Sequence, residues 1–332
     1  MEQKNTKFLE VKDLVVEYTS EGNVIHAVNG VSFALEKGKT LAMVGETGAG
    51  KTTIAKSIIG VLPDHAAKIC GGEILLEGKD LVKAKESEML KVRGAKIAMI
   101  FQDPMTALNP TMKVGKQVAE AIQEHNRISK KEAKERALEM FRLVGIKEDR
   151  YNNYPHEFSG GMKQRVVIAI ALACRPELLL ADEPTTALDV TIQAQVLTMI
   201  KELRDKFNTS MILITHDLGV VANISDAVAV VYAGEIIEYG TKEDIYLHPS
   251  HPYTKGLFRA IPDLDSPTDR LINIKGLPPD PSDLPIGCSF APRCDYCTEE
   301  CKKQKFTSQE IRPGHFCSCP YWNQLKETNV HG

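Results

Sequence analysis

Hydrophobic and polar residues alternate along the first forty residues of the chain. The pattern is clear in FLEVKDLVVEY (8–18) and again in HAVNGVSFAL (26–35). A period of two is typical of strands that bury only one face, so we expect antiparallel strands with an exposed side here. The sequence therefore predicts an N-terminal antiparallel β subdomain.

Short, continuous apolar runs replace this alternation after residue 40. They are TLAMVG (40–45), KIAMIF (96–101), ELLLAD (177–182) and SMILIT (210–215). Such runs are typical of strands buried on both faces, and helical stretches separate them. The sequence predicts an α/β fold with a mostly parallel sheet covered by helices on both faces. A hairpin is expected in VAVVYAGEIIEYG (228–240), with its turn at the central glycine.

A helical insertion of about residues 103–165 is predicted between the second and third of these runs. Its clearest helix is SKKEAKERALEMFRLVG (129–145), which Ser129 can cap while Glu132 reaches back to complete a capping box. Gly145 can close the end of this helix. One apolar face is formed by Ala133, Ala137, Met140, Phe141 and Val144.

The composition of the chain changes beyond about residue 241. HPSHPYTKGLFRAIPDLDSP (248–267) and KGLPPDPSDLPIG (275–287) are rich in proline. We expect an irregular, semi-extended connection there. Residues 1–240 are therefore predicted to form one domain, and residues 241–332 a small irregular tail.

Composition and charge exclude several classes of protein. Of the 332 residues, 43% are hydrophobic and 26% charged, and the formal net charge of −3 gives no support to a nucleic-acid surface. The start MEQKNTKFLEVKD lacks the apolar core of a signal peptide. VVIAIALAC (166–174), among the longest apolar runs, is far shorter than the ~18 residues of a spanning helix. We expect a soluble, cytoplasmic protein, in which disulfides are rare.

GETGAGKTT (45–53) fits the phosphate-binding pattern G-x-x-x-x-G-K-[ST] and lies between a predicted strand and a predicted helix. Glycines let backbone N–H groups close around phosphate oxygens, and the helix N-terminus adds partial positive charge. Lys51 is expected to reach the β and γ phosphates, and the Thr52 hydroxyl to ligate Mg²⁺. A glycine-rich turn that matches by chance is the alternative, which the flanking strand and helix disfavour. The candidate nucleotide-binding residues of this loop are Gly45, Gly48, Ala49, Gly50, Lys51, Thr52 and Thr53.

LLLADEP (178–184) carries two adjacent carboxylates at the end of a buried strand. Strands of parallel sheets end at the ligand crevice, so both carboxylates are expected near the phosphates. Asp182 suits the magnesium site, and Glu183 suits a general base that polarises the attacking water. Taken alone, such a pair is more often a solvated turn; the phosphate loop favours the catalytic interpretation.

Further candidates lie at a helix start and at two strand ends. EFSGGMKQR opens a helix with Ser159, Gly160 and Gly161. A simple N-cap at the serine does not explain two glycines, which cost helix stability, so the motif predicts a second anion site. Gln102 and His216 each follow a buried strand. Alone, each is more often a surface residue, although His216 could contact a γ-phosphate.

In this order, and with TALD at 186–189, these motifs resemble those of the nucleotide-binding subunit of ABC transporters over essentially the whole chain. The resemblance implies that the chain hydrolyses ATP with Mg²⁺. It implies a head-to-tail dimer, in which Ser159 and Gly161 contact the γ-phosphate held by the other subunit. Asp189 would communicate across that interface, and Tyr18 would stack on adenine.

The resemblance also gives Gln102 a role in magnesium binding and catalysis. Phe158 and Met162 depart from the commoner leucine and glutamine of the signature. Neither change removes the serine hydroxyl or the glycine N–H groups, so the implied phosphate contacts stand.

The tail narrows the resemblance. HPYTKGLFRAIP (251–262), GLPPDPSDLPIGCSFAPRC (276–294) and GHFCSCPY (314–321) resemble the tail of the subfamily that energises di- and oligopeptide importers, with nickel importers close relatives. This implies two separate transmembrane permeases, an extracytoplasmic peptide-binding protein that acts indirectly, and a second ATPase subunit, more often a related chain than an identical one. The insertion and the region after Gln102 would dock the permeases. The protein is then expected to be peripheral on the inner face of the cell membrane.

Six of the eight cysteines lie within residues 288–319. Four thiols suffice for zinc or for an iron–sulfur cluster, and spacing alone neither selects between them nor excludes reduced structural thiols. A tail with little apolar content would gain folding energy from a metal, so we expect a structural clamp rather than an electron carrier, with a redox-sensing role as the alternative. The subfamily resemblance implies a [4Fe–4S] cluster held by Cys288, Cys294, Cys301 and Cys319. Cys297 and Cys317 are then extra, and Cys70 and Cys174 are predicted to be packing residues.

A soluble ABC ATPase that acts on ribosomes or nucleic acid is the alternative from another class. Such proteins generally carry two ATPase cassettes, or long coiled-coil or metal-binding insertions. This sequence has one phosphate loop, one signature and a tail of importer type. The predicted function is therefore ATP hydrolysis that energises peptide import, with nickel as the alternative cargo.

Overall fold

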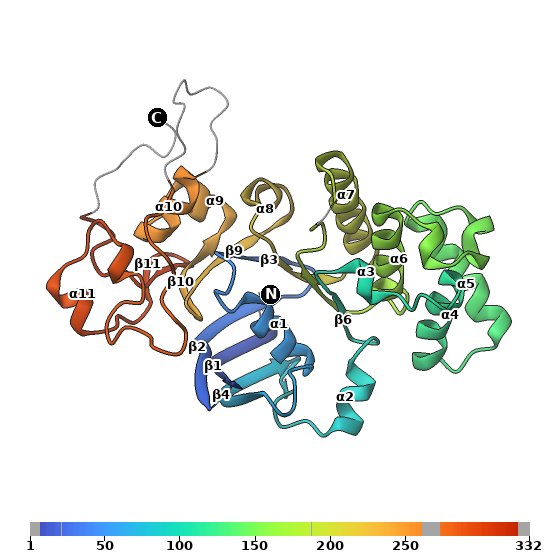
Figure 1. Ribbon diagram of the computed structural model, residues 1–332, viewed down its shortest axis with the longest axis horizontal. Coiled ribbons are helices and arrows are strands. Elements are labelled where there is room, and N and C mark those ends of the chain that lie inside the picture. The colour runs from blue at the N-terminus through green and yellow to red at the C-terminus, as the bar shows by residue number, and fades with distance from the viewer. Residues whose placement is uncertain (1–6, 21, 187, 261–272, 325–332) are drawn as a thin grey trace, which may run out of the picture.

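The computed structural model describes residues 7–20, 22–186, 188–260 and 273–324. Within these residues the strands form two sheets, and helix α1 (Lys51–Ile59) packs between them (Figure 1). The first is antiparallel with the order β2-β1-β4-β5, as the alternating pattern predicts. Its strands are β1 (Lys7–Ser20), β2 (Asn23–Glu36), β4 (Ala67–Leu76) and β5 (Lys79–Asp80).

The larger sheet has the order β11-β12-β10-β9-β3-β8-β7-β6. The four predicted apolar runs are confirmed as strands of its parallel part, and the predicted hairpin joins the antiparallel pair β9 and β10 through Gly234. The strands of this region are β3 (Thr40–Val44), β6 (Ile97–Ile100), β7 (Leu178–Asp182), β8 (Ser210–Ile214), β9 (Ala227–Tyr232) and β10 (Glu235–Thr241).

Both faces of the parallel strands are buried. On β7, Leu178 and Leu180 face the core shared with α1 and the antiparallel sheet, whereas Leu179 and Ala181 face the helical insertion. This explains why β7 reads as a continuous apolar run rather than an alternating one. The other helices of residues 1–240 outside the insertion include α2 (Glu86–Val92), α7 (Val190–Phe207) and α8 (Leu218–Ile224).

The insertion is helical, as predicted. Its longest helix is confirmed within 129–145, and Ser129 Oγ accepts from the N–H of Glu132 at 3.2 Å. The carboxylate of Glu132 pairs with Arg136 at 2.8 Å instead of closing the expected capping box, because an i,i+4 partner is within reach. The insertion helices are α3 (Pro104–Ala107), α4 (Val114–His125), α5 (Lys130–Leu143) and the start of α6 (Gly160–Leu172).

The expectation of an irregular connection after residue 241 is wrong for its first part. Thr241 forms a capping box with Asp244 and starts a helix, and Pro252 occupies the first turn of another. Residues 275–287 are irregular as expected, and 261–272, which include the end of HPYTKGLFRAIP, lie outside the described residues. The elements of this region are α9 (Lys242–Leu247), α10 (Pro252–Arg259), α11 (Glu299–Lys303), β11 (Gln309–Arg312) and β12 (His315–Cys317).

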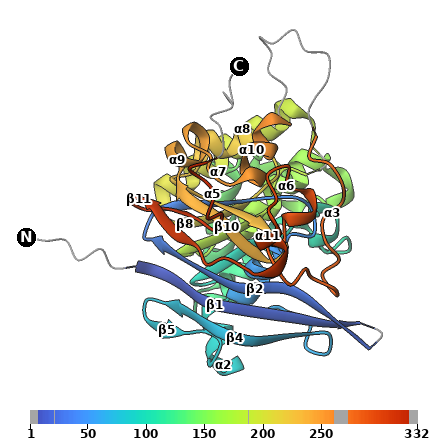
Figure 2. The ribbon, with the colours of Figure 1, turned by 90° about the vertical axis from the view of Figure 1, so that its left-hand side faces the viewer.

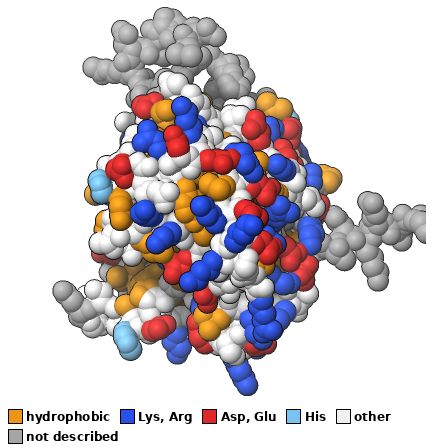
Figure 3. Space-filling view, turned by 90° about the vertical axis from the view of Figure 1, so that its right-hand side faces the viewer, with side chains coloured by type: hydrophobic (Ala, Val, Ile, Leu, Met, Phe, Trp, Pro, Cys, Tyr) orange, Lys and Arg blue, Asp and Glu red, His pale blue; other side chains and the backbone are white. Residues whose placement is uncertain are grey.

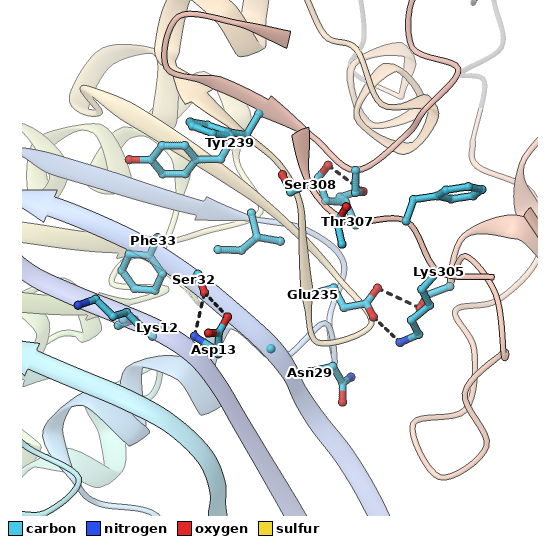
Figure 4. A pocket seen from close by; sticks show the side chains of 18 of the residues that line it. Lys12, Asp13, Asn29, Ser32, Phe33, Glu235, Tyr239, Lys305, Thr307 and Ser308 are labelled. Atoms are coloured by element: carbon cyan, nitrogen blue, oxygen red, sulfur yellow. Dashed lines mark hydrogen bonds and ion pairs between the residues drawn. The ribbon is translucent and has the colours of Figure 1, made fainter. Parts of the chain in front are cut away.

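The tail extends the larger sheet, since β12 pairs with the edge strand β10 and β11 pairs with β12. Seen from the tail side, β1 and β2 run beneath these strands (Figure 2). A cavity of about 800 Å³ lies between β1, β2 and the tail, and at its rim Lys305 pairs with Glu235 while Ser32 bonds Asp13 (Figure 4).

A buried carboxylate fastens the tail to the sheet. Glu238 on β10 is 1% exposed and accepts from the backbone N–H groups of Ser250 and His251 at 2.7 and 2.8 Å. Nε2 of the fully buried His315 on β12 lies 2.9 Å from the same carboxylate. All three partners belong to the region after residue 241, so this glutamate organises it.

We expect Glu238→Ala to lower the free energy of unfolding by about 3 kcal/mol, because it leaves His315 and two buried N–H groups without an acceptor. Urea unfolding followed by circular dichroism measures this change. Glu243→Ala, whose side chain is 67% exposed, is the matched control and should shift stability by less than about 0.5 kcal/mol. Equal effects in the two variants would contradict the anchoring role.

Candidate active site

Two glycines allow the 45–53 loop to lie against its neighbours. Gly45 has a φ of 149°, and a Cβ there would lie 2.1 Å from the carbonyl oxygen of Val231. Gly50 has a φ of 101°, and a Cβ there would lie 2.4 Å from the carbonyl oxygen of Ala27. The predicted phosphate loop is therefore pressed between β2 and β9, and no larger residue fits at either glycine.

Lys51 begins α1 and points back into the loop. Its ammonium donates to the carbonyl oxygens of Gly45 at 2.7 Å and Glu46 at 2.9 Å. The residue is buried, and burial lowers the pKa of Lys51. A cation held by the loop at the N-terminus of a helix suits the binding of phosphate.

Thr52 and Asp182 come together from α1 and the end of β7. The Thr52 hydroxyl donates to Oδ1 of Asp182 at 3.0 Å. Burial raises the pKa of Asp182, and the hydrogen bond from Thr52 opposes this shift. A hydroxyl and a carboxylate beside a phosphate loop supply the hard oxygen ligands that suit Mg²⁺.

Glu183 contacts residues that follow two neighbouring strands. Its Oε2 accepts from Gln102 Nε2 and from Thr186 Oγ1, both at 2.9 Å. Nδ1 of His216 lies 3.5 Å from Oε1, and this imidazole is 72% exposed. Gln102, Glu183 and His216 follow β6, β7 and β8, so the parallel sheet brings these predicted residues to one edge. Glu183 itself has a φ of 45°, a conformation that non-glycine residues rarely adopt.

Tyr18 lies on β1 beside the loop. Its hydroxyl is 3.4 Å from the Thr53 hydroxyl, and the residue is half-buried. The structure thus brings Tyr18 to the nucleotide side of α1, although its expected contact with adenine stays a prediction.

The signature residues are separate from the loop. Ser159 and Gly160 are exposed at the start of α6, which packs on α3, α4, α5, α7 and β6, whereas α1 packs on β2 and the central strands. Ser159 Oγ accepts from the N–H of Met162 at 3.4 Å. A Cβ on Gly161 would lie 2.9 Å from Ile192, so this glycine lets α6 approach α7. Asp189 is exposed and caps α7.

The tail cysteines surround a small cavity of about 20 Å³. The cysteines that line it are Cys288, Cys294, Cys301 and Cys319, the four that the resemblance selects. No group of three or more metal-binding side chains in the described ranges is arranged to hold an ion. Burial raises the pKa of Cys294 to about 12 and that of Cys319 to about 11, so without a metal these thiols are neutral.

The two core cysteines differ from each other. Cys174 is half-buried and donates to the carbonyl oxygen of Ala121, as a packing residue can. Cys70 is exposed on the antiparallel sheet, with its thiol 3.3 Å from Glu17. The prediction that Cys70 packs in the core is therefore wrong; β4 turns that position outward.

Comparison with known proteins places the chain in a family. A family model described as "ABC transporter" matches residues 28–186, and one described as "Oligopeptide/dipeptide transporter, C-terminal region" matches residues 237–301. The dipeptide transport ATP-binding protein DppD of Bacillus subtilis (strain 168) is 51% identical over 98% of this chain and 97% of its own length. The oligopeptide transport ATP-binding protein OppD of the same organism is 56% identical over 88% of this chain and 82% of its own length. The chain belongs to the oligopeptide/dipeptide family of ABC transporter ATP-binding proteins.

Solved structures share the fold of this ABC protein. A post-hydrolysis dimer of the ATP-binding cassette MJ0796, bound to ADP and Pi, matches with a TM-score of 0.64 and 27% identity over 70% of this chain and 98% of that chain. None of the helices described by the structure is long and apolar enough to cross a bilayer.

Sequence reasoning missed a group of residues that touches the loop. Arg293 donates to the carboxylate of Glu46, and the hydroxyl of Tyr253 accepts from the N–H of Glu46 at 2.9 Å. Glu46 occupies a variable position of the phosphate-loop pattern, and Arg293 precedes a cysteine. No motif connects them, so only the fold reveals the contact.

Gly45→Ala should weaken ATP binding by roughly 10- to 100-fold. The new Cβ would clash with Val231 and add ~1–3 kcal/mol of backbone strain, and the loop would have to move to relieve both. Isothermal titration with Mg-ATP measures the affinity. Gly78→Ala is the control: its φ is 82°, but a Cβ there meets nothing within 4 Å. If both variants bind ATP equally, the proposed fit of the loop is incorrect.

Proposed function

We propose that this chain is the ATP-hydrolysing subunit that energises import of dipeptides or oligopeptides through separate membrane permeases. The observation that carries the proposal is the convergence of Lys51, Thr52, Asp182 and Glu183 at one edge of the parallel sheet. Peptide as the cargo, rather than nickel, is supported by the names of the relatives, which are dipeptide and oligopeptide transport proteins.

In the proposed mechanism, Lys51 and the loop N–H groups hold the β and γ phosphates of ATP. Thr52 and Asp182, with Gln102 as a further candidate ligand, would hold Mg²⁺, which would supply positive charge to the phosphates. Glu183 orients and polarises the attacking water, and the hydrogen bonds from Gln102 and Thr186 fix its carboxylate. His216, within 3.5 Å of Glu183, contacts the γ-phosphate.

The site is completed by a second subunit. Ser159, Gly160 and Gly161 form a helix start away from the loop, with Ser159 and Gly160 exposed, and the exposed Asp189 caps α7, which packs against that helix. In a head-to-tail dimer this start meets the γ-phosphate held by the other subunit. The solved cassette dimer supports such an assembly. The second subunit is a related ATPase chain rather than an identical copy. In this chain Tyr18 stacks on the adenine of the ATP bound by its own loop.

Two permeases dock on the helical insertion, which holds the chain at the cytoplasmic face of the membrane, while an extracytoplasmic binding protein delivers the peptide. The insertion face mixes basic, acidic and apolar side chains (Figure 3). Interspersed charges suit a protein partner better than nucleic acid, which selects continuous basic surfaces.

Cys288, Cys294, Cys301 and Cys319 are proposed as the residues that would hold a [4Fe–4S] cluster, with Zn²⁺ as the alternative. Support comes from the cavity that these four side chains line, which excludes Cys297 and Cys317. The role is structural, because ATP-driven import has no redox step.

Glu183→Gln should retain Mg-ATP binding and slow turnover by roughly 10²–10⁴-fold, the usual loss for a general base. Phosphate release and nucleotide titration measure the two properties separately. Glu243→Gln, an exposed glutamate, should hydrolyse at the wild-type rate. A Glu183→Gln protein that turns over normally would remove this residue from the role of base.

Anaerobically purified protein should contain about four iron and four sulfide per chain. Cys294→Ser should lose the metal, whereas Cys297→Ser should keep it, because only Cys294 lines the cavity. Zinc without iron in the purified protein would mean that the tail site binds zinc in place of the cluster. Protein that holds neither metal would contradict the site.

A further inference from the structure

Arg293 of the tail binds Glu46 of the phosphate loop. Nη1 and Nη2 of Arg293 donate to the two carboxylate oxygens of Glu46 at 2.6 and 2.9 Å. The Arg293 side chain is 4% exposed and that of Glu46 is 29% exposed, so water reaches this pair mainly from the glutamate side. A bidentate guanidinium–carboxylate pair fixes both distance and orientation, which makes it a strong geometric constraint on the loop.

The guanidinium is itself held in place. Its Nε donates to the carbonyl oxygen of Lys275 at 2.9 Å, and Nη1 lies 3.3 Å from the hydroxyl of Tyr232. The group also sits 5.8 Å from the centre of the Tyr232 ring. With these partners, Arg293 has one orientation, and that orientation faces Glu46.

Aromatic rings from three segments support the contact. Tyr232 on β9, Tyr253 on α10 and Phe290 in the tail have ring centres 4.6–5.4 Å apart. The fully buried Tyr253 also accepts from the N–H of Glu46. The side chain of Glu46 is therefore held by Arg293 and its backbone by Tyr253.

The same residue orients the lysine that binds phosphate, because the carbonyl oxygen of Glu46 accepts from Lys51 at 2.9 Å. A loop held in this shape before ATP arrives avoids the entropic cost of ordering on binding. We propose that Arg293 is a positioning residue of the nucleotide site, and that the cysteine-rich tail, through Arg293 and Tyr253, sets the affinity for ATP. This inference rests on the proposed ATPase function. Since Arg293 directly precedes Cys294, it also joins the cysteine site to the nucleotide site.

The test is a double-mutant cycle on the full chain, with the dissociation constant for Mg-ATP measured by isothermal titration. Arg293→Gln and Glu46→Gln should each raise this constant about tenfold, and the double variant should be no worse than either. Arg293→Lys should restore part of the affinity, because lysine keeps the charge and loses the bidentate geometry. In steady-state assays KM for ATP should rise while kcat changes less than about twofold. If Arg293 only stabilised the fold, its loss would not raise KM selectively.

Lys305→Gln is the matched control, because it breaks another ion pair between tail and core, with Glu235, and neither of these side chains hydrogen-bonds to residues 45–53 (Figure 4). Its affinity for Mg-ATP should stay within about twofold of wild type. Thermal unfolding and metal content, measured for every variant, report whether the tail is intact. Tyr253→Phe removes one hydroxyl and should raise the dissociation constant about threefold, which keeps the test decisive if Arg293→Gln does not fold.

Unchanged affinity in Arg293→Gln with an intact tail, or additive losses in the double variant, would overturn the positioning role. If Arg293→Gln is unstable, unchanged affinity in both Glu46→Gln and Tyr253→Phe would overturn it as well. Wild-type protein that fails to bind Mg-ATP would instead count against the ATPase function itself.

Discussion

The shape of the phosphate loop is the constraint on which the rest of the structure depends. Two carbonyl oxygens, of Ala27 and Val231, lie where a side chain on Gly50 or Gly45 would have to go. The carbonyl of Ala49 accepts from the N–H of Gly234 at 2.9 Å, which fastens the loop to the hairpin turn. Two segments far apart in the sequence, one at Ala27 and one at 231–234, thus contact the nine-residue loop 45–53. Their packing, rather than the propensity of the loop, determines where its N–H groups point.

The catalytic edge follows from the same sheet. β3 carries the loop, and β6, β7 and β8 deliver Gln102, Glu183 and His216 beside it, because parallel strands end on one side. The signature helix start is exposed and lies apart from the phosphate loop of its own chain. In the proposed cycle each chain supplies its loop to one nucleotide site and its signature to another, so association with a second ATPase is intrinsic to that cycle.

Local patterns predicted the elements and the residues that the structure brings together at the sheet edge. Continuous apolar runs predicted the buried strands, and the glycine and acidic motifs selected the loop and Glu183, whose roles stay predictions. Patterns failed where the outcome depends on contacts distant in sequence. Cys70 is exposed because of the register of β4, and the contact between Glu46 and Arg293 joins residues 247 positions apart. The proline-rich tail packs Phe290 against the core and is held by Glu238 of β10, and its own composition reveals neither contact.

The central claim is that the tail and the phosphate loop form one nucleotide-binding unit. Hydrogen–deuterium exchange of the Glu183→Gln protein, with and without Mg-ATP, tests it directly. The account predicts that ATP slows exchange in residues 45–53 and also in residues 288–294. Slower exchange in the loop, with exchange in residues 288–294 unchanged, would contradict it.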